Sequence, residues 1–281
     1  MIAIVEDVPR YAILAPQHAD IPHCGLSVSR DKSEHATLLG EMQCLRGRIA
    51  VDEGAIERSA LDARGRYVMP LDDKSWHILR LRRNGRVAGC ARILVHPRNV
   101  RFPGLRIASS SIARHSTWGP HVKDAVESEL DLARLHEMTP IEPGGWVVDE
   151  DLRGTREALS IAISAFAWCR ILGNCLGFLT ATVRNGSAGM LRRLGARGLP
   201  MGGAVIPACF EPAWGCNMEL LRFDTSSLNP RFDNALCAAQ LGLLRSLVVS
   251  DEAPPLLGSM RRHVDAQVIN STEMALTRMV A

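Results

Sequence analysis

The stretch from Glu142 to Gly195 constrains the fold of this chain more than any other part of the sequence. An apolar strand ends at Val148, and it is followed by a charged turn, a long apolar helix, a second apolar strand and a short basic helix. The N-terminus of a helix has unpaired backbone N–H groups, which bind anions. This order of elements therefore predicts a site for a phosphate-bearing ligand beside a splayed pair of strands.

The composition is that of an ordinary globular protein that can bury a full core. The net charge of +3 is too small to indicate nucleic acid as a partner. No run of about 18 apolar residues is present, so no transmembrane helix is expected. The N-terminus lacks the basic segment of a secretory signal. We therefore expect a cytoplasmic protein.

The eight cysteines do not form a CxxC motif, and no histidine cluster has the spacing of zinc ligands, so we expect no metal site. Most of them lie in apolar runs, where a thiol behaves as a small hydrophobic group. Cys90, in the middle of a strand, is expected to belong to the core. This use of cysteine fits a reducing compartment.

The remaining elements follow from periodicity and turn signals. Asn84-Gly85 between two apolar runs predicts a β-hairpin, and Asp31 or Ser33 is expected to cap a helix. The predicted helices cover 32–50, 121–136, 155–172 and 231–249, and the predicted strands cover 11–15, 75–83, 86–95, 177–183, 204–208 and 217–223.

These elements predict an α/β protein with a mixed sheet and helices on both faces. The main domain is expected over residues 31–250. An N-terminal segment over 1–30 would hold the first strand, and a helical tail would cover 251–281 as a C-terminal extension.

The turn before the long helix is the first candidate binding site. Arg153 and Arg156 add positive charge to the free amides there, and Gly154 and Thr155 lie between them. Together these residues can hold a pyrophosphate or a phosphopantetheine phosphate. We assign Asn185, which follows the second strand, to the same donor site. The alternative is a charged start of a helix on a solvent-exposed surface.

The motif Arg153-x-x-Arg156-x-Ala158 resembles the donor loop of the GNAT-type N-acyltransferases, Arg/Gln-x-x-Gly-x-Gly/Ala. The resemblance implies a GNAT-like, centrally splayed sheet. Arg156 stands where the family has its central glycine, which lets the backbone approach a pyrophosphate. Leu191 stands where the family usually carries a tyrosine that protonates the leaving thiolate. Both departures argue against an ordinary acetyl-coenzyme A enzyme.

A narrower resemblance covers roughly residues 40–250. Leu45-Arg46, Asp72-Asp73 and the run GRVAGCARIL resemble motifs of the acyl-homoserine lactone synthases and the N-acyl amino acid synthases. The segment from Trp214 to Asp224 is similar to a C-terminal strand of the latter. The lactone synthases have an arginine at the position of Gly145, so the resemblance favours an amino acid or another small amine as acceptor.

The resemblance also implies a long acyl chain delivered by acyl carrier protein, with acyl-coenzyme A as the other donor. Basic residues steer acidic partners such as carrier proteins, although they are also typical of a solvated surface. An apolar tunnel for the chain is expected near Phe166, Leu176 and Phe178. The relevant arginines lie on the long loop and near the last basic helix: Arg98, Arg101, Arg106, Arg114, Arg184, Arg192, Arg193 and Arg197.

Glu142 is the candidate base. Acylation of an amine requires loss of a proton, which a partly buried carboxylate accepts directly or through water. A backbone amide near Val148 is expected to bind the thioester oxygen as negative charge develops. The alternative for Glu142 is a surface residue beside Pro143.

Asp72 and Asp73, with Arg46, are the candidate acceptor-binding residues. The carboxylates can bind an ammonium group, or Asp72 and Arg46 can form a structural ion pair. Three other functions remain open: an acetyl-coenzyme A-dependent acetyltransferase, an acyl-homoserine lactone synthase and a non-catalytic module that binds acyl groups or carrier protein.

Overall fold

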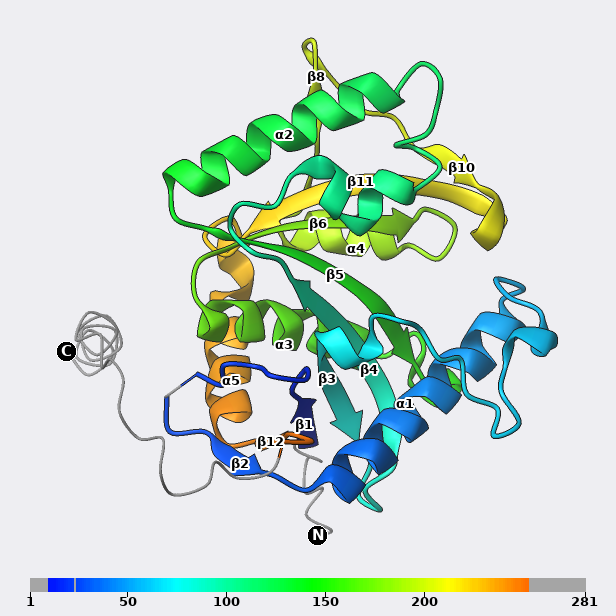
Figure 1. Ribbon diagram of the computed structural model, residues 1–281, viewed down its shortest axis with the longest axis vertical. Helices are drawn as coiled ribbons and strands as arrows, with labels where there is room; N and C mark the ends of the chain where they lie inside the picture. The colour runs from blue at the N-terminus through cyan, green and yellow to red at the C-terminus, as the bar shows by residue number, and fades with distance from the viewer. Residues whose placement is uncertain (1–9, 23, 253–281) are drawn as a thin grey trace, which may run out of the picture.

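The computed structural model describes residues 10–22 and 24–252. The predicted tail helix falls mostly on 253–281, outside the described residues. Within the described part, ten strands form one mixed sheet (Figure 1). The main path across this sheet is β10 (Cys209–Glu211), β11 (Cys216–Asp224), β6 (Cys175–Thr182), β5 (Thr139–Val148), β4 (Val87–Val95), β3 (Ser75–Leu81), β1 (Arg10–Leu14), β12 (Leu247–Val249) and β2 (Ser27–Ser29).

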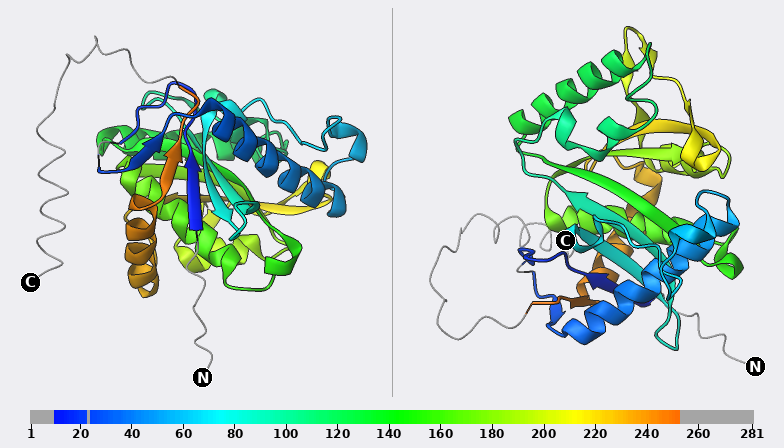
Figure 2. Two further views of the ribbon diagram at one scale, coloured as in Figure 1. Left: turned by 90° about the horizontal axis from the view of Figure 1, so that it is seen from below. Right: turned by 45° about the vertical axis from the view of Figure 1, so that its right-hand side comes forward.

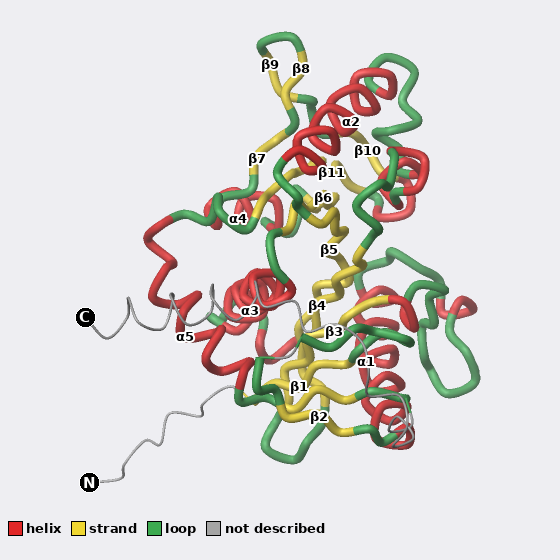
Figure 3. The backbone as a smooth tube through the Cα atoms, turned by 60° about the vertical axis from the view of Figure 1, so that its left-hand side comes forward, coloured by secondary structure: helices red, strands yellow, loops and turns green. Residues whose placement is uncertain are grey.

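Helices cover both faces of the sheet, as the sequence predicts. Figures 2 and 3 show α3, α4 and α5 on one side of the strands and α1 on the other, and α2 packs over the β6–β11 end. Asp31 caps α1 through hydrogen bonds from the amides of Ser33 and Glu34. The helices are α1 (Lys32–Asp52), α2 (Gly119–Leu135), α3 (Glu157–Leu172), α4 (Ser187–Leu194) and α5 (Asp233–Leu244). None of the described helices is long and apolar enough to span a membrane.

The sheet opens at its centre. β5 and β6 are parallel, and they pair only from Thr139 to Ile141 on β5 and from Cys175 to Gly177 on β6. Beyond these residues β5 follows β4 and β6 follows β11, so the two strands diverge toward their carboxyl ends (Figure 1). The predicted splayed pair of strands is therefore present.

A β-bulge lies on β5 within the splayed part. Val147 pairs with Cys90 and Gly144 pairs with Arg92, so Gly145 and Trp146 together face Ala91. Gly145 has a φ of 58°, a conformation that glycine adopts without strain. Bulges bend a strand and redirect its side chains, and they are frequent next to functional sites.

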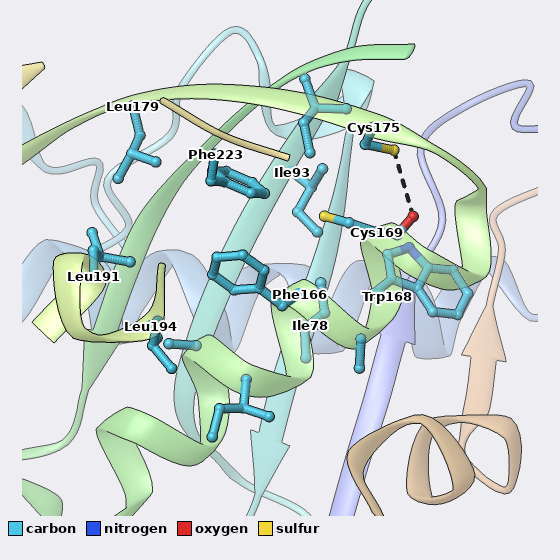
Figure 4. Packing of buried hydrophobic residues seen from close by; sticks show 14 of the residues in the cluster. Ile78, Ile93, Phe166, Trp168, Cys169, Cys175, Leu179, Leu191, Leu194 and Phe223 are labelled. Carbon is cyan, nitrogen blue, oxygen red and sulfur yellow. Dashed lines mark hydrogen bonds between the residues drawn. The ribbon is translucent and has the colours of Figure 1, made fainter. Parts of the chain in front are cut away.

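The core has separate clusters on the two faces. One lies under α3, where the rings of Phe166 and Phe223 are 4.5 Å apart and the Cys175 thiol donates to the carbonyl of Cys169 (Figure 4). Leu176 and Phe178 belong to a second cluster, which packs against α2. Leu176 and Phe178 are two residues apart on β6 and point to the same face of the sheet, whereas Phe166 packs on the opposite face, so the three residues do not line one tunnel.

Two element predictions were wrong. The helix predicted over 231–249 ends at Leu244, and Leu247–Val249 form β12 between β1 and β2. The β-branched Val248 and Val249 suit a strand, and the edge of β1 gives them a partner. The strand predicted over 204–208 is divided: β9 (Ala204–Val205) pairs with β8 (Pro200–Met201), and the main sheet resumes at Cys209.

The first strand was predicted over 11–15 and is observed as β1, Arg10–Leu14, inside the main sheet. The hairpin about Asn84-Gly85 and the strand that ends at Val148 are also present. A two-residue strand, β7 (Arg197–Gly198), pairs with β11 beside the main path.

Candidate functional site

The open end of the β5–β6 pair is the candidate site. β5 leads through a short turn into α3, and β6 leads into α4, so both helices begin at the carboxyl ends of the diverging strands. Ligands of open α/β sheets bind at such divergence points. No hydrogen bond reaches the backbone amides of Ala158 and Leu159 in the first turn of α3 from the described part of the chain. The N-terminus of α3 is therefore available to an anion.

The amide of Val148 points into the opening. Asp149 donates its N–H to Ala88 of β4 at 2.8 Å. Successive backbone amides of a strand point to opposite edges, so the amide of Val148 points away from β4. β6 does not pair with this part of β5, because their ladder ends at Ile141. The bulge itself lies just before this position, at Gly145 and Trp146.

Two of the predicted donor residues, Arg153 and Asn185, contact one carboxylate. Glu53, at the end of α1, lies 3.1 Å from the guanidinium of Arg153 and accepts a hydrogen bond of 3.0 Å from Asn185. The structure thus brings together two residues that lie far apart in the sequence. Arg153 and Asn185 are exposed, so these contacts leave room for a competing phosphate.

The other residues of the turn shape the helix start. Thr155 accepts a hydrogen bond from the amide of Glu157, and its hydroxyl donates to the carbonyl of Leu152. Gly154 has a φ of 71°, and a side chain at this position would meet no atom within 4 Å. Arg156 is exposed immediately before α3. The turn is therefore ordered by its own contacts, and both of its arginines, Arg153 and Arg156, are exposed.

Glu142 is buried rather than at the surface, with 3% of its surface exposed. It lies at the first position after β5 leaves β6. One carboxylate oxygen accepts hydrogen bonds from Nε2 of His96 at 2.8 Å and from the amide of Arg106 at 2.7 Å, and the other accepts from the amide of Ile107 at 2.8 Å. Glu142 thus anchors the loop before α2 and pairs with His96, a residue that the sequence analysis did not identify.

Asp72 and Arg46 form a buried, bidentate pair with N–O distances of 2.8 and 2.6 Å. Asp72 also accepts hydrogen bonds from the side chain of Gln43 and the amide of Met69. Burial alone would raise the pKa of Asp72, but the bonds from Arg46, Met69 and Gln43 outweigh it and lower the pKa. Asp73 is exposed and does not join this pair.

Two further polar residues lie beside this pair on the same face of the sheet. His77 of β3 and Arg92 of β4 are direct cross-strand partners, and both are buried. Burial lowers the pKa of His77 to about 4 and that of Arg92 to about 10. His77 is therefore neutral at pH 7, whereas Arg92 remains charged. We call His77, Arg92 and Glu142 the polar strip, because they lie on the same face of the neighbouring strands β3, β4 and β5, with Glu142 two residues along from the partner of Arg92.

Cys90 is not placed to act as a nucleophile. Its thiol is buried and donates to the carbonyl of Gly145 at 3.3 Å. Burial raises its pKa to about 11, so the thiolate is scarce at neutral pH. Among the described residues, no group of three or more histidine, cysteine or carboxylate side chains is placed to hold a metal ion.

Comparison with known proteins identifies the fold. No protein-family model and no curated protein matches the sequence. The structure is similar to that of BjaI, a CoA-dependent acyl-homoserine lactone synthase, solved with SAM and isopentyl-CoA. The TM-score is 0.53 at 15% identity, over 88% of this chain and 95% of that chain. BjaI with MTA gives a TM-score of 0.52 at 14% identity, over the same shares of the two chains.

The acyl-homoserine lactone synthase LasI matches with a TM-score of 0.45 at 17% identity, over 72% of this chain and 89% of that chain. At these identities the likeness to BjaI establishes the fold alone. It confirms the GNAT-like, acyl-homoserine lactone synthase-like architecture that the sequence motifs predict.

Proposed function

We propose that this protein is an N-acyltransferase that moves an acyl group from a phosphopantetheine thioester to the amine of an amino acid or a related small amine. One observation carries the proposal: the unpaired edge of β5 at Val148 leads directly into the free N-terminus of α3. The edge suits a thioester carbonyl, and the helix start suits the phosphate of the same donor.

The reaction forms a C–N bond and breaks a C–S bond. The amine attacks the thioester carbonyl, and the amide of Val148 stabilises the oxyanion that develops. The nitrogen loses a proton, and the thiolate leaves and takes up a proton. Preorganised donors of this kind typically contribute about 3 kcal/mol to the transition state.

Glu142 is the proposed base, acting directly or through water together with His96. The carboxylate is held by three donors, so its position is fixed. His96 is about 10% exposed and connects the buried carboxylate to the surface. This pair thus offers a route by which the amine proton reaches solvent.

The donor side fits a phosphopantetheine arm. Arg153, Gly154, Thr155 and Arg156 would hold its phosphate, and Asn185 would approach from the β6 side. Acyl carrier protein is the proposed donor. Among the described residues, Arg101 and Arg192 are neutralised by carboxylates. Within the part of the chain that the structure describes, six other arginines form no ion pair with a carboxylate and would be free to meet an acidic carrier: Arg98, Arg106, Arg114, Arg184, Arg193 and Arg197.

Coenzyme A thioesters are the second donor to test. BjaI has the same fold and is described as CoA-dependent. We place the reaction in the cytoplasm, and the eight free cysteines support a reducing compartment. The acceptor would bind on the face that carries Arg46, Asp72 and the polar strip, with Asp73 at its exposed margin.

The test is a transfer assay with purified protein. Acyl carrier protein and coenzyme A, each charged with chains of different length, are combined with the twenty L-amino acids, and N-acyl products are measured by mass spectrometry. We expect one acceptor class to be acylated and Glu142→Gln to lower turnover about 100-fold or more. Donor binding without any N-acyl product would indicate a non-catalytic module instead. Turnover with S-adenosylmethionine would indicate a lactone synthase.

A further inference from the structure

Arg92 is a buried cation without an anionic partner. It is 2% exposed, and none of the ion pairs among the described residues includes it. Nη1 lies 3.9 Å from the sulfur of Met69, which is a weak acceptor, and Nε has no partner. A buried charge that is unpaired is strongly unfavourable, so such a group is normally kept for a ligand or a reaction.

Among the described residues, the neighbouring carboxylates form no hydrogen bond or ion pair with Arg92. Asp72 already accepts four hydrogen bonds and Glu142 accepts three. Burial lowers the pKa of Arg92 most, the nearby cations Arg106 and Arg46 lower it further, and the charges of Asp72 and Glu142 raise it. Three arginines thus face two carboxylates. The site around Arg92 therefore has an excess of positive charge that an anion would neutralise.

His77 adds a second unpaired group next to Arg92. Nε2 of His77 lies 2.9 Å from the carbonyl oxygen of Asp72. A carbonyl oxygen only accepts hydrogen bonds, so Nε2 carries the hydrogen and Nδ1 has a free lone pair. Nδ1 is buried without a partner. One cationic donor and one neutral acceptor thus lie side by side on β3 and β4, and neither is satisfied.

The location matches the acceptor half of the reaction. Arg92 pairs with Gly144, and a Cβ at Gly144 would lie 3.1 Å from its Nη2. This position is between Glu142, the proposed base, and Val148, the proposed oxyanion donor. Because Gly144 has no side chain, the guanidinium packs directly against the backbone of β5.

We propose that Arg92 binds the carboxylate of the acceptor, and that Nδ1 of His77 accepts a hydrogen bond from the same molecule. The inference rests on the proposed function and restricts its substrate to amines that carry a carboxylate. In an α-amino acid the nitrogen is about 2.5 Å from the carboxylate carbon. A carboxylate held at Gly144 therefore keeps the amine close to both Glu142 and the unpaired edge of β5.

The experiment compares each acylated amino acid with its amide, which has the same amine but no carboxylate. Both are assayed with the wild-type protein, Arg92→Gln and Arg92→Lys. We expect Arg92→Gln to lower kcat/KM for the acid about 100-fold or more, since a site built to bind a polar group discriminates strongly. The rate of Arg92→Gln with the amide should stay within about threefold of the wild-type rate with the amide. This result would also show that the variant is folded. Arg92→Lys keeps the charge, so its kcat/KM for the acid should lie between those of the wild type and Arg92→Gln.

Two results would overturn the inference. One is an equal loss for acid and amide in both variants, which indicates a structural role for Arg92. The other is that the wild-type protein acylates amides or simple amines as efficiently as acids, in which case the proposed function stands without this inference.

If the wild type acylates nothing, the proposed function fails. Calorimetric titration of the same L-amino acids and amides, without donor, then still decides whether Arg92 binds a carboxylate.

Discussion

Arg46 and Arg92 are buried against the same face of the sheet, but their surroundings differ. Arg46 is matched by the bidentate carboxylate of Asp72 and also donates to the carbonyl of Tyr67. Arg92 has a thioether sulfur as its hydrogen-bond acceptor, and beside it lies His77, whose Nδ1 has no partner among the described residues. Nε of each arginine lacks a partner among the described residues, but only the first cation has its anion. In charge, the first site is complete without a ligand and the second is not, which separates a structural ion pair from a binding group.

The largest expected effect is on stability at the complete pair. Arg46→Met leaves the Asp72 carboxylate buried without its cation, and we expect a loss of about 3–5 kcal/mol in the free energy of unfolding. Urea denaturation measures this loss. Arg48→Met is the matched control, because Arg48 is a half-exposed arginine on the same helix that pairs with Asp149. The control should cost less than about 1 kcal/mol, and equal losses would break the comparison.

The next effect is a dependence of stability on pH at the incomplete site. Burial lowers the pKa of His77 from 6.5 to about 4 in the folded protein. Between these values the unfolded chain binds a proton that the folded chain does not. The free energy of unfolding should therefore fall as the pH decreases from 6.5 to 4, by up to about 1.4 kcal/mol per pH unit.

His77→Gln should flatten this slope, whereas His121→Gln, at an exposed histidine of α2, should leave it unchanged. The ion pair of Arg46 with Asp72 changes the free energy of unfolding over a different, lower pH range. The pKa of Asp72 is lowered from 3.8, so its contribution is complete above that pH and is lost as the pH falls through the folded value. An unchanged slope in His77→Gln would contradict the burial of a neutral histidine.

A smaller effect is expected at the donor turn, outside both buried sites. Arg153 is about 40% exposed, so Arg153→Ala should change stability by less than about 1 kcal/mol. Loss of a charge-assisted bond to a phosphate should raise the KM for the acyl donor about tenfold. Arg192→Ala, at an exposed arginine paired with Glu219, is the control. An equal rise in both variants would indicate general electrostatic steering rather than a phosphate site.

The smallest expected effect on stability is that of Arg92→Met. The substitution removes an unpaired buried charge and keeps most of the apolar volume, so the free energy of unfolding should stay within about 1 kcal/mol or rise. Urea denaturation of Arg92→Met and Arg46→Met under the same conditions compares the two buried arginines most directly. A loss as large as that of Arg46→Met would mean that Arg92 is already satisfied within the fold.

The sequence predicted those parts of the molecule that depend on local pattern. Asn84-Gly85 located the central hairpin, Asp31 located the start of α1, and the strand before Val148 followed from its apolar run. β12 was missed, because whether Leu247–Val249 form a helix or a strand depends on the partner that β1 provides. Such long-range pairing leaves no local signal.

The same limit applies to the site. Residues 142–148 were predicted as its centre, and they border the opening of the sheet. The ion pair of Arg46 with Asp72 was one of two alternatives, and it is present. His96, His77 and Arg92 were not assigned roles, because their importance lies in contacts across strands. The run GRVAGCARIL contained a signal for Arg92: a charged residue in the middle of an apolar strand that is buried on both faces.

The central claim is that the open edge of β5 binds an acyl thioester. A crystal structure with an acyl-pantetheine analogue, in which a ketone replaces the thioester, tests it directly. The account predicts that the ketone oxygen lies 2.7–3.1 Å from the amide nitrogen of Val148 and that the phosphate lies at the N-terminus of α3. An analogue bound elsewhere, with the Val148 amide unoccupied, would contradict it.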